Sequence, residues 1–484
     1  MSHPLRTALI LFGVVGLLLA AGRARTQPPE EKIPPPREFG GFRLQVPSEA
    51  AGKEGIAVRL TLPERPRYYF DGAPVVVIVP GGLGPGSLGG SPFGATALGF
   101  AAVQFTFPGG PGSGGTFDQR GPASLMALRD VVRFALGEQA SSEGKTIQDY
   151  AGKLLKVNTR NVGMLGLSNG GNQAIAVAGL FGGRMRSLAW IVNWESPVGP
   201  GMVNAELGSW FNPPLPGQKP DEKGNPVVNP AYNPDTGKLD LTKLAYSPAL
   251  EVTPFPPRTG KPGAAKFPPG GLYFDINGNG KVDPGTDFVP YPLVIPGKEG
   301  PKIVYSLHLQ AEAEARQLYG KRRPAHLASV EEAAEFWRYR DGSRWVRSAV
   351  ANCPRLMFLV VAGERDHFQS APDHPHIRFQ YLAFREASSW LTRLNPDRSY
   401  VQLLAGKEVK AADNPARAVF DAKTIRAALE PEPAKGGAPA PLLQLAALCE
   451  VADRTQTDNT KAQLDAVLYS FAPPLEEQPM PPAK

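Results

Sequence analysis

The sequence has little cysteine and no concentrated charge, and both shortages limit what the protein can be. Two of its 484 residues are cysteine, Cys353 and Cys449, which either form one disulfide or remain two buried thiols. The net charge of +7 comes from lysines and arginines scattered along the chain, with no basic stripe interleaved with aromatic residues. We therefore expect no binding to nucleic acid.

Glycine and proline, in contrast, are abundant. The chain contains 53 glycines and 52 prolines, nearly twice the average usage. This composition excludes a helical bundle or a coiled coil, and a hydrophobic content of 42% excludes a wholly disordered chain. The excess glycine and proline must lie in loops, where catalytic and binding residues are usually placed.

The N-terminal region has the layout of a secretory signal peptide. Arg6 precedes an apolar run from Ala8 to Ala21, and small residues follow as far as Ala24. The run is shorter than the roughly 20 residues that span a bilayer, and no cysteine follows it to carry a lipid. We expect residues 1–24 to be removed, which leaves a secreted or periplasmic protein with no stable membrane span. An uncleaved membrane anchor is the alternative.

The rest of the chain divides into a core, an insertion and two proline-rich segments. Residues 25–40 form a linker. Residues 41–200 and 346–428 alternate strands with helices, which predicts an α/β fold with a doubly wound, mostly parallel sheet. Within it, the β-branched run Val75–Val79 is typical of a strand buried on both faces. Further strands are expected at 42–46, 56–62, 100–107, 162–167, 188–193, 356–362 and 400–404, and helices at 123–136 and 172–178.

Residues 201–345 interrupt this alternation and predict an insertion that serves as a lid at the carboxyl edge of the sheet. Proline, glycine and asparagine are dense in its first part, and two helices are expected within 306–350. The aromatic residues of 337–345 either pack onto the body of the protein or line a substrate pocket. Residues 429–484 form a proline-rich extension with one helical stretch around 442–451.

The strongest chemical signal is the hexapeptide GLSNGG at residues 166–171, which matches G-x-S-x-G between a predicted strand and a predicted helix. In this motif Ser168 must occupy a tight, strained turn, so the residues two positions away on either side cannot carry bulk. Its hydroxyl is then exposed above the sheet, and the N-terminus of the following helix favours negative charge there. The alternative is a tight turn in which the serine is incidental.

With this motif in its context, the chain resembles the α/β-hydrolase superfamily over roughly residues 42–200 and 345–425. The Ser-Asn-Gly-Gly sequence is similar to that of prolyl-oligopeptidase-like members and related esterases. The resemblance implies an eight-stranded sheet and acyl-transfer chemistry on esters or peptides.

The resemblance also implies an oxyanion hole made of two backbone N–H groups. One belongs to Asn169, directly after the nucleophile. The other belongs to the loop after Val75–Val79, where Pro80-Gly81-Gly82 stands in place of the family's His-Gly-Gly, and we assign it to Gly82. The glycines that follow in this loop fit a dinucleotide fingerprint only nominally, because no acidic residue follows the next strand at the required distance. We therefore expect no organic cofactor.

The family's acid follows the strand at 356–362, which points to Asp366, with Glu195 as the second choice. A loop salt bridge is the structural alternative for Asp366. The family's histidine follows the last strand, but residues 405–414 contain none and no histidine follows His376. His374 and His376 are our candidates for the base. His367, and His308 and His326 in the insertion, are further ones. The cluster at 366–376 could instead bind zinc, although its spacing matches no zinc motif.

A second motif in the insertion resembles an EF-hand calcium loop. Oxygen-bearing side chains stand at loop positions 1, 3, 5 and 9, and a glycine stands at position 6. Asp287 comes one residue after position 12 and is expected to close the shell. The predicted ligands are Asp275, Asn277, Asn279, the backbone carbonyl of Lys281, Asp283 and Asp287. They predict a structural Ca²⁺ ion that orders the lid, and an asparagine- and glycine-rich turn without metal is the alternative.

Together these patterns predict an exported serine hydrolase that cleaves small carboxylic esters, with peptides or amides as a wider class, through an acyl-enzyme on Ser168. The alternative is an exported binding protein that keeps the fold without turnover, because the usual histidine is absent. A third interpretation is a metal-dependent hydrolase that uses the 366–376 cluster.

Overall fold

The computed structural model of the chain describes the core and much of the insertion. The described residues are 38–68, 70–89, 94–153, 155–194, 196–199, 203–207, 229–233, 238–252, 254, 267–297, 300–361 and 440–456. The predicted signal peptide, most of the linker, the predicted strand at 400–404 and the cluster at 366–376 lie outside them. No helix among the described residues is long and apolar enough to cross a membrane.

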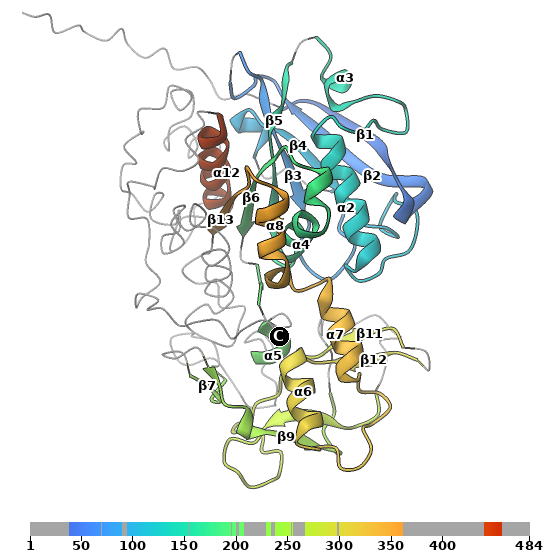
Figure 1. The fold of residues 1–484 in the computed structure, drawn as a ribbon, viewed down its shortest axis with the longest axis vertical. Coiled ribbons are helices and arrows are strands. Elements are labelled where there is room, and N and C mark those ends of the chain that lie inside the picture. The colour runs from blue at the N-terminus through green and yellow to red at the C-terminus, as the bar shows by residue number, and fades with distance from the viewer. Residues whose placement is uncertain are drawn as a thin grey trace, which may run out of the picture. The chain divides into compact units, whose positions relative to one another are not determined.

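The described core strands form a seven-stranded sheet in the order β1-β2-β4-β3-β5-β6-β13 (Figure 1). β2 runs antiparallel to both of its neighbours, and the remaining pairs are parallel. This mixed, mostly parallel sheet is typical of α/β-hydrolases and confirms the predicted fold class. The strands are β1 (Glu38–Ser48), β2 (Gly52–Pro63), β3 (Ala73–Val79), β4 (Ala101–Phe105), β5 (Val157–Leu167), β6 (Leu188–Trp194) and β13 (Met357–Val361).

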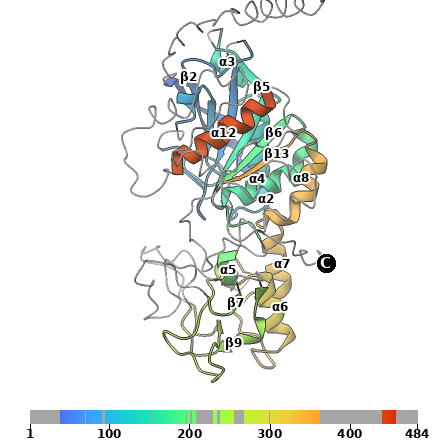
Figure 2. The same cartoon turned by 90° about the vertical axis from the view of Figure 1, so that its left-hand side faces the viewer.

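Helices cover both faces of the sheet (Figures 1 and 2). On one face lie α2 (Pro122–Ala135), α4 (Gly170–Phe181) and α8 (Val346–Asn352), and on the other lies α12 (Ala440–Gln456). Shorter helices are α3 (Ile147–Ala151) and the 3-10 turns η1 (Glu49–Ala51), η2 (Thr96–Leu98) and η3 (Gly182–Arg184).

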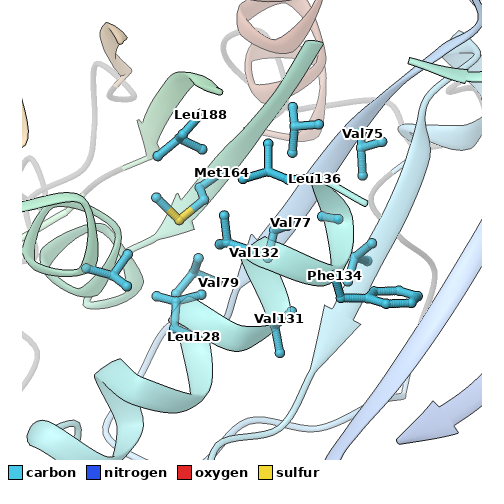
Figure 3. Close-up of a cluster of buried hydrophobic side chains, with 14 of the residues drawn as sticks. Val75, Val77, Val79, Leu128, Val131, Val132, Phe134, Leu136, Met164 and Leu188 are labelled. Atoms are coloured by element: carbon cyan, nitrogen blue, oxygen red, sulfur yellow. The ribbon is translucent and has the colours of Figure 1, made fainter. Parts of the chain in front are cut away.

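Strand β3 shows why the two faces are apolar. Val75, Val77 and Val79 point into the cluster that contains α2, α4 and α8 (Figure 3). Val76 and Ile78 point into the cluster on the α12 face. Because successive side chains of a strand alternate between faces, a continuous apolar run is needed where both faces are covered. The prediction for this strand is confirmed.

The two cysteines lie in different layers of the core. Cys353 belongs to the cluster on the α2 face and Cys449 to the cluster on the α12 face, and both are buried and not joined in a disulfide. The disulfide alternative is therefore wrong, and the alternative of two buried thiols is confirmed. Burial raises the pKa of the Cys353 thiol to about 12, so this thiol stays protonated and unreactive at neutral pH.

Helix α12 is fixed to the segment between β2 and β3 by a buried ion pair. Arg67 donates from Nε and Nη2 to the two carboxylate oxygens of Asp453 at 2.8 and 2.7 Å. The Tyr68 hydroxyl donates to the same carboxylate at 2.7 Å. All three side chains are buried. This anchor makes the helical part of the C-terminal extension a component of the core.

The insertion consists of short elements with their own apolar clusters. One cluster is built around Phe274 and Phe288, and another around Trp337. Three α-helices, not two, fall within 306–352, and the last of them, α8, belongs to the core. The elements of the insertion are α5 (Val203–Leu207), β7 (Tyr232–Asn233), β8 (Lys238–Leu239), η4 (Leu241–Lys243), β9 (Leu244–Ser247), β10 (Gly271–Phe274), β11 (Leu293–Ile295), β12 (Lys302–Val304), α6 (Leu307–Ala315), α7 (Val330–Arg338) and η5 (Gly342–Trp345).

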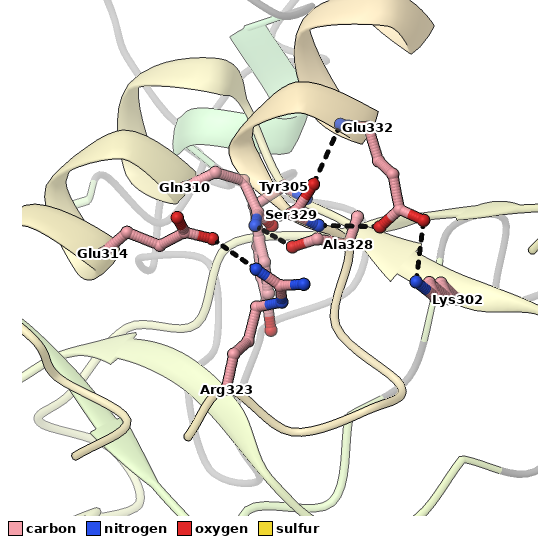
Figure 4. A network of polar contacts seen from close by, with 8 residues as sticks. All are labelled: Lys302, Tyr305, Gln310, Glu314, Arg323, Ala328, Ser329 and Glu332. Atoms are coloured by element: carbon pink, nitrogen blue, oxygen red, sulfur yellow. Dashed lines mark hydrogen bonds and ion pairs between the residues drawn. The ribbon is translucent and has the colours of Figure 1, made fainter. Parts of the chain in front are cut away.

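Polar side chains link these short elements (Figure 4). Lys302 on β12 pairs with Glu332 on α7 at 2.7 Å, and Glu332 also caps its own helix by accepting from the N–H of Ser329. Gln310 on α6 donates to the Ala328 carbonyl and accepts from the Tyr305 N–H. These bonds satisfy backbone groups that such short strands and helices leave unpaired.

Candidate active site

Ser168 lies in a strained turn between β5 and α4. Its φ angle is 48°, in the left-handed region that residues other than glycine rarely adopt. The turn is held from both sides, because Ser168 N–H donates to Trp194 O at 2.7 Å and Gly171 N–H donates to Ser168 O at 3.0 Å. Such strain persists where the surroundings fix the backbone, and it is common at functional sites.

The two glycines that flank the serine at a distance of two residues are required by packing. A Cβ on Gly166 would lie 2.5 Å from Gly171 Cα and 2.7 Å from Asn193 Oδ1. A Cβ on Gly170 would collide with the carbonyl oxygen of Val79. The structure thus gives the reason for both glycines that the sequence motif requires.

The loop of residues 80–89, which follows β3 and is called the glycine loop below, lies against Ser168. A Cβ on Gly81 would be 3.3 Å from Ser168 Cβ, and the Asn169 side chain donates from Nδ2 to Gly82 O at 3.2 Å. Gly82 has a φ of 70°, and this left-handed backbone conformation is the reason for a glycine there. Crowding is not the reason, because no atom lies within 4 Å of a Cβ built on Gly82.

The N–H groups of Gly82 and Asn169 make no hydrogen bond to any described residue. The structure therefore brings the two predicted oxyanion donors together beside Ser168, with both N–H groups available. Two unoccupied N–H donors are what the oxyanion of an acyl transfer requires, and this role for Gly82 and Asn169 stays a prediction.

The predicted acid and bases lie outside the described residues. This applies to Asp366, Glu195, His367, His374 and His376. Which histidine acts as the base, and which carboxylate orients it, therefore remain predictions.

Two histidines of the insertion are described, and both have partners. His308 Nδ1 is 2.9 Å from Glu206 Oε1, and the hydrogen bond and charge of Glu206 raise the pKa of His308. His326 Nε2 is 2.9 Å from the Gly270 carbonyl oxygen. Within the described part of the chain, no hydrogen bond joins either ring to Ser168.

The described part of the insertion contacts the region around the serine. Gly342 N–H donates to Asn172 Oδ1 at 2.8 Å, and Asn172 Nδ2 donates to Asn169 Oδ1 at 3.3 Å. Leu83, next to Gly82, packs against the apolar cluster that contains Trp337. Trp337 is fully buried and donates from Nε1 to Tyr305 O at 2.8 Å, so it packs in the protein interior and does not line a pocket.

One residue near the site carries no recognisable sequence signal. Arg120, just before α2, is buried and donates from Nη2 to the carbonyl oxygens of Gly81 at 2.7 Å and Gly84 at 3.2 Å. It is one arginine among many in the sequence, and no motif marks it. Its contact depends on a turn that brings it to a loop about 40 residues earlier in the chain, which no local pattern reveals.

The predicted calcium loop folds around the carboxylates of Asp275 and Asp283. Asp275 accepts hydrogen bonds from the N–H groups of Gly278 and Gly280, both at 2.8 Å. The side chains of Asn277 and Asn279 donate to Asp283 Oδ2 at 2.7 and 2.5 Å. The side chains at loop positions 3, 5 and 9 are thus joined directly, whereas the carboxylate at position 1 is bonded to backbone N–H groups of the loop.

The last predicted ligand, Asp287, is buried and joins the two ends of the loop. Its Oδ1 accepts from Ile276 N–H at 2.9 Å and its Oδ2 from Asp283 N–H at 2.8 Å. Lys281 N–H donates to Asn279 Oδ1 at 2.8 Å. No group of three or more histidine, cysteine, aspartate or glutamate side chains among the described residues is arranged to hold a metal. The oxygen-rich donor set suits Ca²⁺ in its chemistry, and the site remains a prediction.

No family model and no curated protein matches this sequence. The chain is similar to the solved structure of an esterase from the archaeon Pyrobaculum calidifontis, with 17% identity and a TM-score of 0.23 over 36% of this chain and 51% of that one. It is similar to a bacterial brefeldin A esterase, a homologue of human hormone-sensitive lipase, with 17% identity and a TM-score of 0.25 over 41% of this chain and 51% of that one. It is also similar to carboxyl esterase 2 from the fungus Tuber melanosporum (18%, 0.25, 43% and 64%). The chain spans about half the length of the first two structures. The fold class is defined by the strand order of the sheet, not by these distant similarities.

Proposed function

We propose that the protein is a serine hydrolase that cleaves small carboxylic esters through an acyl-enzyme on Ser168. The observation that carries this proposal is the strained serine turn, with the N–H groups of Gly82 and Asn169 beside it and available. A strained turn is costly to keep for packing alone, and free N–H donors beside a serine suit acyl transfer.

In the proposed reaction, Ser168 Oγ attacks the ester carbonyl carbon while a histidine takes its proton. The carbonyl oxygen becomes an oxyanion held by the Gly82 and Asn169 N–H groups, and one such donor is typically worth about 3 kcal/mol of transition-state stabilisation. The histidine then gives its proton to the departing alcohol. Water attacks the acyl-enzyme by the reverse sequence and regenerates the serine. We assign the proton transfers to His374 or His376, oriented by Asp366.

We infer a small carboxylic ester as the substrate, with peptides or amides as a wider class. In this proposal residues 1–24 direct export and are removed, so that the enzyme acts outside the cytoplasm with the insertion as its lid.

A structural calcium ion in the insertion is part of the proposal. Asp275, Asn277, Asn279, Asp283 and the Lys281 carbonyl would hold it, with Asp287 joining the loop ends, and its contribution would be to folding and not to the reaction. Calorimetry in calcium and in EDTA tests this directly. We expect a higher melting temperature in calcium for the wild type and no difference for Asp275→Ala. Identical wild-type melting curves in the two buffers would show that calcium does not stabilise the protein and would contradict the proposed site.

The second candidate, an exported binding protein without turnover, is favoured by one observation, the absence of a histidine after residue 376. Hydrolysis of short p-nitrophenyl esters by the purified mature protein separates the two. We expect turnover by the wild type, turnover at the wild-type rate by Ser343→Ala, and loss of at least about a thousandfold in kcat by Ser168→Ala. A wild type that hydrolyses no faster than Ser168→Ala would favour the binding protein.

A further inference from the structure

No carboxylate among the described residues pairs with the buried guanidinium of Arg120. Its side chain is 1% exposed, and its guanidinium carbon lies 5.0 Å from the centroid of the Phe107 ring. Of its nitrogens, Nη2 donates to two carbonyl oxygens, whereas Nε and Nη1 are buried and make no hydrogen bond within the described part of the chain. Arg67 and Arg129, which are also buried, pair with Asp453 and Asp130 instead. Buried Arg340 resembles Arg120, because it too donates to backbone carbonyl oxygens.

An unpaired buried charge is unfavourable, so its location needs an explanation. Burial lowers the pKa of Arg120 to about 9, which still leaves the guanidinium positively charged at neutral pH. The positive charge therefore persists next to the glycine loop, in a place where no described residue supplies a permanent negative charge.

The contact with Gly81 fixes the peptide group that carries the predicted oxyanion donor. Gly81 C=O and Gly82 N–H belong to the same planar unit, and in a trans peptide they point in opposite directions. An arginine that holds this oxygen at 2.7 Å therefore sets the direction of the Gly82 N–H. The hydrogen bond also polarises the peptide, which makes its N–H a stronger donor.

The next peptide group is held as well. Asn169 donates from Nδ2 to the Gly82 carbonyl oxygen, so the peptide groups on both sides of Gly82 are fixed by side chains. The turn that carries Arg120 is itself anchored by the insertion, because Arg340 donates to the carbonyl oxygens of Gln119 and Asp118. The insertion is thus connected to the glycine loop through Arg340 and Arg120.

We propose that Arg120 is the positioning residue of the oxyanion hole, aiming the Gly82 N–H at the substrate oxygen and opposing the negative charge that forms there. This inference rests on the proposed function. Arg120 does not touch the substrate. No described residue compensates its charge before the tetrahedral intermediate forms, so its effect is greater in the transition state than in the bound substrate.

The test compares Arg120→Met, Arg120→Gln and Arg120→Lys in the full mature protein, with Arg129→Met as the matched loss of a buried arginine outside the site. Outright loss of an oxyanion donor lowers kcat by about 100- to 1000-fold. Because Arg120→Met keeps the N–H but releases its peptide, we expect kcat for p-nitrophenyl acetate to fall about 30-fold. KM should stay within about threefold, Arg120→Lys should recover part of the loss, and Arg129→Met should keep the wild-type kcat.

A second readout separates positioning from general destabilisation. A trifluoromethyl ketone forms a hemiketal oxyanion with an active serine, and its affinity should fall in Arg120→Met by about the same factor as kcat/KM. Where Arg120→Met does not fold, Arg120→Gln decides the question, with an expected loss of at least tenfold in kcat.

The possible failures can be told apart. A wild type without esterase activity overturns the proposed function and this inference together. An active wild type whose Arg120→Gln variant keeps both kcat and ketone affinity overturns this inference alone. The same holds if Arg129→Met loses as much kcat as the Arg120 variants, because the effect would then be one of stability.

Discussion

The Asn169 side chain donates a hydrogen bond to the carbonyl oxygen of Gly82 across 3.2 Å. These two residues are separated by 87 positions in the sequence and are the ones whose N–H groups we assign to the oxyanion hole. The residue after the nucleophile therefore contributes twice, by its own N–H and by holding the loop that supplies the other donor. This contact makes the geometry of the hole a property of the folded core and not of the loop alone.

Asn169→Ala tests that contact, because it keeps the backbone N–H and removes the side-chain bond. A neutral hydrogen bond contributes about 1 kcal/mol, so we expect kcat to fall about fivefold with little change in KM. Steady-state kinetics on a short ester measures this. An unchanged kcat in a folded Asn169→Ala protein would show that the loop holds its geometry without Asn169.

Gly82→Ala tests the backbone requirement of the loop. Gly82 has a φ of 70°, so alanine there should lower the free energy of unfolding by about 1 kcal/mol and also displace the N–H donor. Gly84→Ala is the matched control, since Gly84 lies in the same loop, has open space for a Cβ and does not have a positive φ. The free energy of unfolding, measured by chemical denaturation, and kcat should both change in Gly82→Ala and stay at wild-type values in Gly84→Ala. Equal effects in both would contradict the conformational argument.

Asp453→Ala tests the anchor of α12. The change leaves the Arg67 guanidinium buried without its carboxylate, and breaking a buried pair in this way costs about 3–5 kcal/mol of stability. Thermal unfolding should show a large loss for Asp453→Ala. The exposed pair of Lys145 and Glu143 offers a control, and Lys145→Ala should leave the melting temperature unchanged. A wild-type melting temperature for Asp453→Ala would mean that α12 is held by its apolar contacts alone.

The pair of His308 and Glu206 predicts a pH dependence in the insertion. The hydrogen bond and charge of Glu206 raise the pKa of His308, with a further contribution from Asp341 and an opposing one from Arg344. A raised folded-state pKa gives stability that is fully present below the ordinary histidine value of about 6.5 and is lost as the pH rises through the raised value.

We therefore expect the difference in melting temperature between wild type and Glu206→Gln to be largest near pH 6 and to shrink toward pH 9. Melting curves across this range measure it. A difference that stays constant with pH would show that Glu206 acts through packing and not through the charge of His308. His308 is half exposed, so we expect the effect to be modest.

The elements predicted from the sequence were those whose signal is local. The run Val75–Val79 and the glycines around Ser168 each carry their structural reason within a few residues, and the structure has the strand and the turn where the sequence places them. Such patterns reflect the backbone conformation of a turn and the alternation of side chains along a strand, and both are determined by neighbouring residues. The oxyanion roles of Asn169 and Gly82 are implied by the family resemblance and stay predictions, although the structure places these two residues in contact.

The features that the sequence did not predict depend on long-range contacts. Arg67 and Asp453 are separated by 386 positions, and nothing near either residue indicates the other. For the same reason the sequence left open whether Cys353 and Cys449 are bonded, and it did not single out Arg120. The helix at 442–451 was predicted, but its packing on the sheet was not, since the apolar face of a helix does not determine which surface it packs against.

The central claim is that Ser168 is an activated nucleophile, and covalent labelling tests it most directly. The purified mature protein would be treated with a fluorophosphonate probe in calcium-containing buffer, beside Ser168→Ala and a Ser196→Ala control. The buried Ser196 hydroxyl donates to the same Trp194 carbonyl oxygen as the Ser168 N–H. The account predicts one labelled site in the wild type and in Ser196→Ala, located at Ser168 by mass spectrometry, and none in Ser168→Ala. A folded wild type that remains unlabelled, or a label at another residue, would contradict it.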